Sequence, residues 1–193
     1  MMIHGLQKMT LLDFPGRVAC TVVLGGCDFR CPYCHNFELA DGTAKPVMDD
    51  GALFAFLEKR RGLLDGVAIT GGEPCLHPGL PDLMRGIRAM GYAVKLDTNG
   101  AHPDRLEAIL AEGLADYVAM DIKNSPEKYA RTAGLKAMDL APVRRSVELL
   151  MRGGVDYEFR TTVVDELHEA EDFEVIGAWI AGALPSTSSK LWQ

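Results

Sequence analysis

Three cysteines stand close together in the segment GGCDFRCPYCHNFEL, at Cys27, Cys31 and Cys34. Three residues separate the first two and two residues separate the last two. Thiolates are soft ligands that select zinc, Cu(I) or iron–sulfur clusters. A structural zinc site and an ordinary [4Fe–4S] cluster each use four protein ligands, one more than this group supplies. Because catalytic metal centres keep one position open, the spacing predicts a cluster whose fourth iron binds a substrate or cofactor.

A zinc site is the alternative interpretation of the same segment. His35 follows Cys34 directly and could complete a Cys3His ligand set in a non-enzymatic zinc module. Two adjacent residues rarely both point at one tetrahedral ion, which favours the cluster. Both interpretations stay open on the residues alone.

The remaining cysteines and histidines receive no ligand role from their positions. Cys20 falls within a predicted strand and is expected to be a core thiol, and Cys75 is expected to be a loop thiol. The other histidines are expected on the surface or in loops: His4, His77, His102 and His168. Clustered cysteines in a chain without an export signal indicate reduced thiols rather than a disulfide framework.

Composition and charge narrow the class of protein. The chain has 193 residues, of which 48% are hydrophobic and 24% charged, with a net charge of −7. This charge argues against nucleic acid or an anionic membrane as partner. The start, MMIHGLQKMT, has no apolar segment of a secretory signal, and the apolar run 18–24 is far shorter than the roughly 20 residues of a membrane helix. We expect a single soluble, cytoplasmic domain over residues 1–193.

Apolar runs with strand character alternate with helical patterns, which predicts βαβ units and a parallel sheet. Strands are expected at 18–24, 66–70, 92–97, 116–122 and 155–164, and the start of a sixth at 189–193. Helices are expected at 49–61, 80–90, 103–112, 139–152 and 169–183. The alternation fits an open partial barrel or a doubly wound sheet. In both folds the active site lies at the carboxyl ends of the strands.

Chemically unusual residues fall at those strand ends. The cysteine segment follows the first strand, and TGGEPC (70–75) follows the second. LDTNG (96–100) ends the third strand, MDIK (120–123) ends the fourth, and Arg160 lies on the fifth. We therefore expect one site assembled from five segments.

The TGGEPC segment could contact a ligand directly. Gly71 and Gly72 permit positive φ and a close approach of the backbone to a ligand. Glu73 can accept a hydrogen bond from an ammonium or hydroxyl group. A plain turn is the alternative, because Gly-Gly and Pro occur in many loops.

Charged groups at the other strand ends predict a polar site. Asp97 and Asp121 repel one another unless a cation lies between them or one is protonated, so we expect a bound cation there. Lys123 would reach outward to a carboxylate or ribose. Turn capping is the alternative for Asp97 and Asn99. Arg160 lies among apolar neighbours and needs a carboxylate partner, from the protein or a cofactor.

These motifs carry a resemblance to a known family. With its C-x3-C-x2-C segment and GGEP after the second strand, the chain resembles the radical S-adenosylmethionine (SAM) superfamily. The opening GLQKMTLLDFPGRVACTVVLGGCDFRCPYCHNFEL, with LDTNG and DIK, looks more narrowly like the glycyl-radical-enzyme activases. Within these, the likeness is to the type that activates anaerobic ribonucleoside-triphosphate reductase.

The resemblance implies a fold, cofactors and partners. The fold would be a partial (β/α)6 barrel, truncated at its C-terminal end because relatives continue past a sixth strand. A [4Fe–4S] cluster on the three cysteines would bind SAM and cleave it to methionine and a 5′-deoxyadenosyl radical. That radical would take a hydrogen from a glycine of a glycyl radical enzyme. Electrons would come from an external one-electron donor such as flavodoxin or ferredoxin.

The resemblance also implies residue roles and leaves one rival of the same family. Residues holding or contacting SAM would be Tyr33, Gly71, Gly72, Glu73, Lys123 and Arg160. Asp97, Thr98 and Asp121 would match a monovalent-cation site. The rival is a radical SAM enzyme that acts on a small molecule, of the 7-carboxy-7-deazaguanine synthase type.

Overall fold

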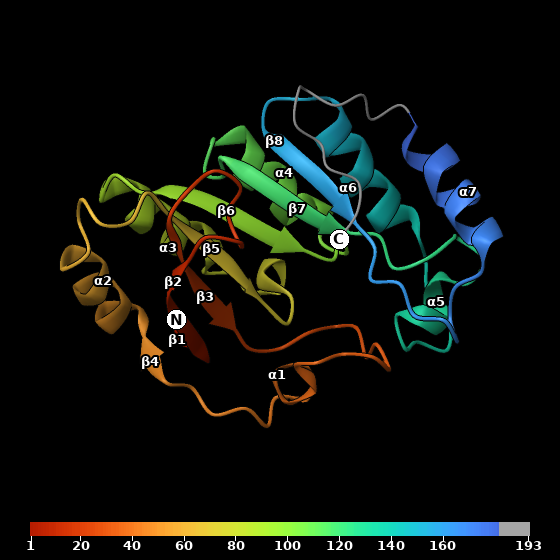
Figure 1. Ribbon diagram of the computed structural model, residues 1–193, viewed down its shortest axis with the longest axis horizontal. Helices are drawn as coiled ribbons and strands as arrows, with labels where there is room; N and C mark the ends of the chain where they lie inside the picture. Colours follow the sequence, from red (N-terminus) through yellow and green to blue (C-terminus); the bar gives the residue numbers. More distant parts are fainter. Residues whose placement is uncertain (182–193) are drawn as a thin grey trace.

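Six strands form the central sheet of the protein, whose computed structural model describes residues 1–181 (Figure 1). They are β2 (Gly5–Thr10), β3 (Ala19–Leu24), β5 (Gly66–Gly71), β6 (Ala93–Thr98), β7 (Tyr117–Asp121) and β8 (Asp156–Arg160). Their spatial order is β2-β3-β5-β6-β7-β8. Strands β3 to β8 pair in parallel, and β2 pairs antiparallel with β3. A further pair, β1 (Met2–Ile3) and β4 (Met48–Asp49), is antiparallel.

The strand order decides between the two predicted architectures. Each parallel strand pairs with the next one along the chain, so the order runs in one direction from residue 19 to residue 160. A doubly wound sheet reverses its order at a switch point. The observed order is that of a partial barrel, and Figure 1 shows the five parallel strands lying side by side in chain order.

Helices connect the parallel strands and extend from α2 at one end of Figure 1 to α7 at the other. The longer ones are α2 (Asp50–Glu58), α3 (Leu80–Ala89), α4 (Pro103–Ala111), α6 (Ala141–Met151) and α7 (Ala170–Ile180). Short turns are α1 (Phe37–Asp41), α5 (Tyr129–Thr132) and the 3-10 helix η1 (Pro74–Leu76). Among helices within residues 1–181, none has the length and apolar character needed to cross a membrane.

Burial explains why these segments fold as they do. Five of the six residues of β3 are buried, as expected for a parallel strand covered on both faces. In α3 the apolar side chains recur at helical spacing, and Leu80, Leu83, Met84 and Ile87 are all buried in the main core. Packing of the helices on the buried strands holds the sheet in place. The loops of the site follow the carboxyl ends of its parallel strands.

The five predicted strands and five predicted helices within residues 1–181 are confirmed, with shifted ends. Strand β8 ends at Arg160 rather than at residue 164. The sequence analysis did not find β2, because the side chains of this edge strand are mostly exposed and lack an apolar pattern. The expected sixth strand at 189–193 and the end of the last expected helix lie outside the described residues.

Candidate functional site

The cysteine loop, residues 25–36, leaves the carboxyl end of β3 and leads into α1. Cys31 is buried, Cys27 and Cys34 are half-buried, and all three are free thiols. Burial raises the pKa of Cys27 to about 11 and also raises the pKa of Cys31, an increase that the nearby charge of Lys123 opposes. Metal binding releases the protons of thiol ligands, so a cation bound in this loop would favour the ionised form of Cys27 and Cys31.

The two glycines of the TGGEPC segment pack against the cysteine loop. The N–H of Gly72 donates to the Leu24 carbonyl at 2.9 Å, and the N–H of Glu73 donates to the Gly26 carbonyl at 2.8 Å. A Cβ on Gly71 would lie 2.0 Å from the oxygen of Leu24, and a Cβ on Gly72 would lie 2.0 Å from the oxygen of Gly26. The two glycines thus approach the end of β3 and the start of the cysteine loop closely, and their approach to a ligand stays a prediction. Positive φ is found at Gly71, where it is 136°.

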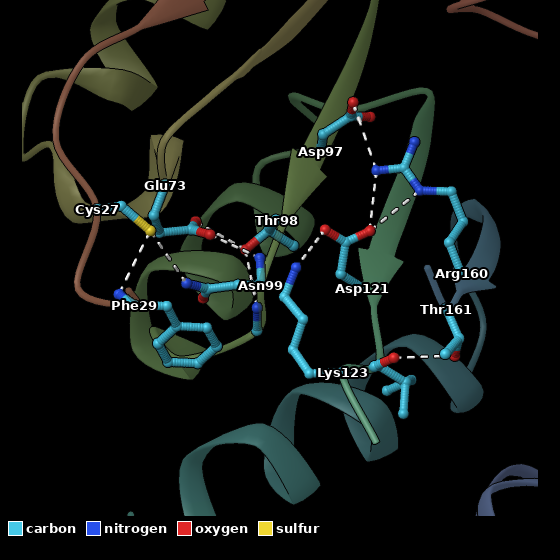
Figure 2. A network of polar contacts seen from close by, with 12 residues as sticks. Cys27, Phe29, Glu73, Asp97, Thr98, Asn99, Asp121, Lys123, Arg160 and Thr161 are labelled. Atoms are coloured by element: carbon cyan, nitrogen blue, oxygen red, sulfur yellow. Dashed lines mark hydrogen bonds and ion pairs between the residues drawn. The ribbon is translucent and has the colours of Figure 1, made fainter. Parts of the chain in front are cut away.

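Glu73 joins three loops from the centre of this edge (Figure 2). Its side chain is fully buried and accepts hydrogen bonds from the N–H of Cys75 (2.8 Å), the hydroxyl of Thr98 (2.8 Å) and the N–H of Asn99 (2.6 Å). Burial raises the pKa of Glu73 to about 7, although these bonds favour the ionised form. The donors to Glu73 in this structure are groups of the protein itself. A contact between Gly71–Glu73 and SAM stays a prediction.

A second polar cluster lies at the ends of β6, β7 and β8 (Figure 2). The guanidinium of Arg160 lies 3.5 Å from Oδ2 of Asp97 and 3.2 Å from Oδ1 of Asp121. The ammonium of Lys123 is 2.9 Å from Oδ2 of Asp121, and that of Lys95 is 2.8 Å from Oδ1 of Asp97. The predicted carboxylate partner of Arg160 is confirmed, and there are two such partners, Asp97 and Asp121.

The same cluster bears on the expected cation between the two aspartates. The guanidinium of Arg160 takes the bridging position, so Asp97 and Asp121 need no inorganic ion to offset their repulsion. Burial opposes the ionisation of Asp121, but the charges of Lys123 and Arg160 keep its pKa below the ordinary value. The monovalent-cation role of Asp97, Thr98 and Asp121 remains a prediction that nothing in this geometry requires.

Three of the histidines set aside in the sequence analysis hold loops of the site. Nε2 of His77 lies 2.7 Å from the Gly25 carbonyl, and Nε2 of His102 lies 3.2 Å from the Asp28 carboxylate. Nε2 of His168 lies 2.9 Å from the carbonyl of Lys123. His168 is buried, so the expectation of a surface or loop histidine was incomplete there. No sequence pattern marks these contacts, because each joins residues far apart in the chain.

The donors present fit an iron–sulfur cluster better than a zinc ion. Among residues 1–181, no three His, Cys, Asp or Glu side chains converge closely enough to hold one metal ion. A cluster has several attachment points, because each thiolate binds its own iron. The buried hydroxyl of Tyr33, between two of the cysteines, has no hydrogen-bond partner within the described part of the chain. The Cys3His zinc alternative finds no support in this arrangement.

The comparison that decides the family is with a sequence model of the radical SAM superfamily, which matches residues 21–176. The chain belongs to this superfamily. Radical SAM enzymes use a [4Fe–4S] cluster and SAM, and the site described above contains the three free thiols on one loop that such a cluster requires.

Individual relatives and a solved structure agree with this assignment. A Methanocaldococcus jannaschii protein named "putative glycyl-radical enzyme activating enzyme" is 30% identical over 187 residues, covering 91% of this chain and 73% of that protein. The pyruvate formate-lyase-activating enzyme of Clostridium pasteurianum is 34% identical over 129 residues, covering 63% of this chain and 52% of the enzyme. The structure of native anSMEcpe with bound AdoMet aligns with a TM-score of 0.62 and 22% identity, covering 81% of this chain and 47% of that one. This last likeness concerns the fold.

Proposed function

We propose that this radical SAM protein activates a glycyl radical enzyme, and that the partner is an anaerobic ribonucleoside-triphosphate reductase. The observation that carries the activase role is the 30% identity over 91% of the chain to a protein named as such an enzyme. The choice of reductase rests on the likeness of the opening segment and of LDTNG and DIK to that type of activase.

In this proposal Cys27, Cys31 and Cys34 hold the cluster. When bound, the cluster and SAM supply a one-electron cleavage that yields methionine and a 5′-deoxyadenosyl radical. Lys123 lies close enough to Cys31 for its positive charge to act there, and Arg160 adds a second positive charge at the ends of β6 and β7, so a carboxylate ligand could pair with either group. The buried Glu73 bonds to Gly26, Thr98 and Asn99 and so fixes the backbone beside the cysteine loop.

The electron is proposed to come from a separate protein. Only Cys20 and Cys75 remain outside the cysteine loop, and both are buried in the core. Burial raises the pKa of Cys20 to about 12 and that of Cys75 well above its ordinary value, so both stay protonated thiols. A second cluster would need more thiolates. An external one-electron donor such as flavodoxin or ferredoxin is therefore part of the proposal.

Electron paramagnetic resonance tests the proposal. The anaerobically reconstituted protein is mixed with SAM, a reductant and the candidate reductase, and the spectrum is searched for a glycyl radical. We expect the radical with the wild type and none with Cys31→Ala. SAM cleavage without a radical on the reductase, but with turnover of a small-molecule substrate, would instead support an enzyme of the 7-carboxy-7-deazaguanine synthase type.

A further inference from the structure

Asn99 ties together three segments at the carboxyl edge of the sheet. Its backbone N–H donates to Glu73, its side-chain N–H donates to Oδ1 of Asp28 at 2.8 Å, and its side-chain oxygen accepts from the N–H of Ala101 at 2.9 Å. The residue is only 5% exposed. Turn capping, the sequence-based alternative, describes only the contact with Ala101. The contact with Asp28 reaches across to the cysteine loop.

The carboxylate of Asp28 lies against the loop that follows β6, which donates a hydrogen bond to one of its oxygens. Oδ1 accepts from the Asn99 amide, and Oδ2 lies 3.2 Å from Nε2 of His102. Asp28 directly follows Cys27 in the chain. The hydrogen bond from Asn99 to Oδ1 restricts the backbone on which Cys27 sits.

The sulfur of Cys27 has two N–H groups beside it (Figure 2). The backbone N–H of Phe29 donates to it at 3.4 Å, and the amide nitrogen of Asn99 lies 4.0 Å away. Hydrogen bonds to cluster sulfurs are among the features that set reduction potential. Donors stabilise the reduced cluster more, because it carries the greater negative charge.

We propose that Asn99 is a positioning residue for Cys27, acting through Asp28, and that its amide raises the reduction potential of the cluster. The proposal rests on the proposed function only in requiring a cluster at Cys27. Groups that orient metal ligands typically matter by about 10–100-fold in metal affinity or activity. Loss of the Asn99 side chain should loosen Cys27 and make the cluster harder to reduce.

Asn99→Ala is the first variant, because it removes the side-chain amide and keeps the hydrogen bond from the backbone N–H to Glu73. Ser146→Ala is the matched control. Its buried hydroxyl donates to the Gly100 carbonyl at 2.8 Å, next to Asn99 in the chain, without touching Asp28. The double variant Asp28→Ala/Asn99→Ala measures whether the two residues act as one unit.

Two readouts follow each variant: the midpoint potential of the cluster and, in cluster-free protein, the rate at which Cys27 is alkylated. For Asn99→Ala we expect the equilibrium between oxidised and reduced cluster to shift about tenfold toward the oxidised form, which lowers the midpoint potential by ~59 mV for one electron. We also expect faster alkylation of Cys27. Ser146→Ala should match the wild type in both. In the alkylation rate, the double variant should increase no further than the larger of Asp28→Ala and Asn99→Ala.

A wild-type potential and a wild-type alkylation rate in Asn99→Ala would overturn the proposal. If Asn99→Ala fails to take up a cluster, the alkylation rate of Cys27 alone tests the proposal. An unchanged rate then shows that Asn99 does not position Cys27. These outcomes are separate from those of the proposed function. If the wild-type protein takes up a cluster but forms no glycyl radical on the reductase, the activase role is refuted. The role of Asn99 is still tested, because the potential of the cluster can be measured in Asn99→Ala.

Discussion

Asp121 and Arg160 face one another across β7 and β8, and Nε and Nη2 of the arginine both lie 3.2 Å from Oδ1 of the aspartate. The pair closes a chain of charges that runs from Lys123 through Asp121 and Arg160 to Asp97. Parallel strands in chain order bring these side chains to one edge of the sheet. The alternation of positive and negative groups keeps the carboxyl edge of the sheet close to neutral, which matters because these side chains are only partly exposed.

Replacing Arg160 should destabilise the protein through the aspartates it leaves behind. Arg160→Gln removes the charge between Asp97 and Asp121, so that their repulsion is offset only by the separate lysine partner of each. Because 39% of the arginine side chain is exposed and solvent screens it, we expect a loss of about 1–2 kcal/mol in the free energy of unfolding. Urea denaturation of the cluster-free protein measures this loss.

The control for that experiment is a second substitution in the same background. Asp97→Asn added to Arg160→Gln removes one of the two repelling charges and should restore part of the lost stability. A double variant as unstable as the sum of its single variants would mean that the charges do not interact.

The backbone contact between the GGEP segment and the cysteine loop should not tolerate a methyl group. In Gly72→Ala the new Cβ would meet the Gly26 oxygen at 2.0 Å, and we expect a loss of about 2–3 kcal/mol together with poorer cluster uptake. Gly177→Ala is the matched control in α7, where a Cβ meets nothing within 4 Å. It should be neutral or stabilising by up to about 1 kcal/mol. Equal unfolding midpoints for the two variants would contradict the packing described here.

Glu73 should make the stability of the cluster-free protein depend on pH. Its pKa rises from 4.5 to about 7 on burial, so the folded protein binds this proton more tightly than the unfolded chain does. The resulting stabilisation is complete below pH 4.5 and is lost as the pH rises to about 7, by about 3 kcal/mol in total. Urea denaturation at several pH values should show this fall in the wild type and its absence in Glu73→Gln. Parallel pH profiles for the two proteins would show that Glu73 does not titrate in this range.

The sequence predicts most of the fold because the fold depends on repeating patterns. Strands such as β3 are buried on both faces and read as apolar runs, and α3 carries its apolar side chains at helical spacing. The edge strand β2 has neither feature, since one side of it faces no neighbouring strand within the described chain. Chain order equals spatial order in this sheet, which is why loops chosen from the sequence do meet at one edge.

The partners within the site could not be predicted in the same way. Glu73 has the right residue type to accept hydrogen bonds, but only the folded chain shows that Thr98 and Asn99 supply the donors. Sequence spacing also does not show that Arg160 reaches over from the next strand to contact both Asp97 and Asp121, where the monovalent cation remains a prediction. His168 contacts Lys123 from 45 residues away, with no local pattern to mark it. Such contacts depend on side-chain reach, which sequence spacing does not encode.

The central claim is that Cys27, Cys31 and Cys34, and not the core thiols, hold a [4Fe–4S] cluster that binds SAM. Iron and sulfide analysis of anaerobically reconstituted Cys31→Ala and Cys20→Ala, with SAM cleavage measured on the same samples, tests it most directly. The account predicts about four irons per chain and SAM cleavage for Cys20→Ala, as in the wild type, and loss of SAM cleavage for Cys31→Ala. A cluster that survives with full SAM cleavage in Cys31→Ala, or one that disappears in Cys20→Ala, would contradict it.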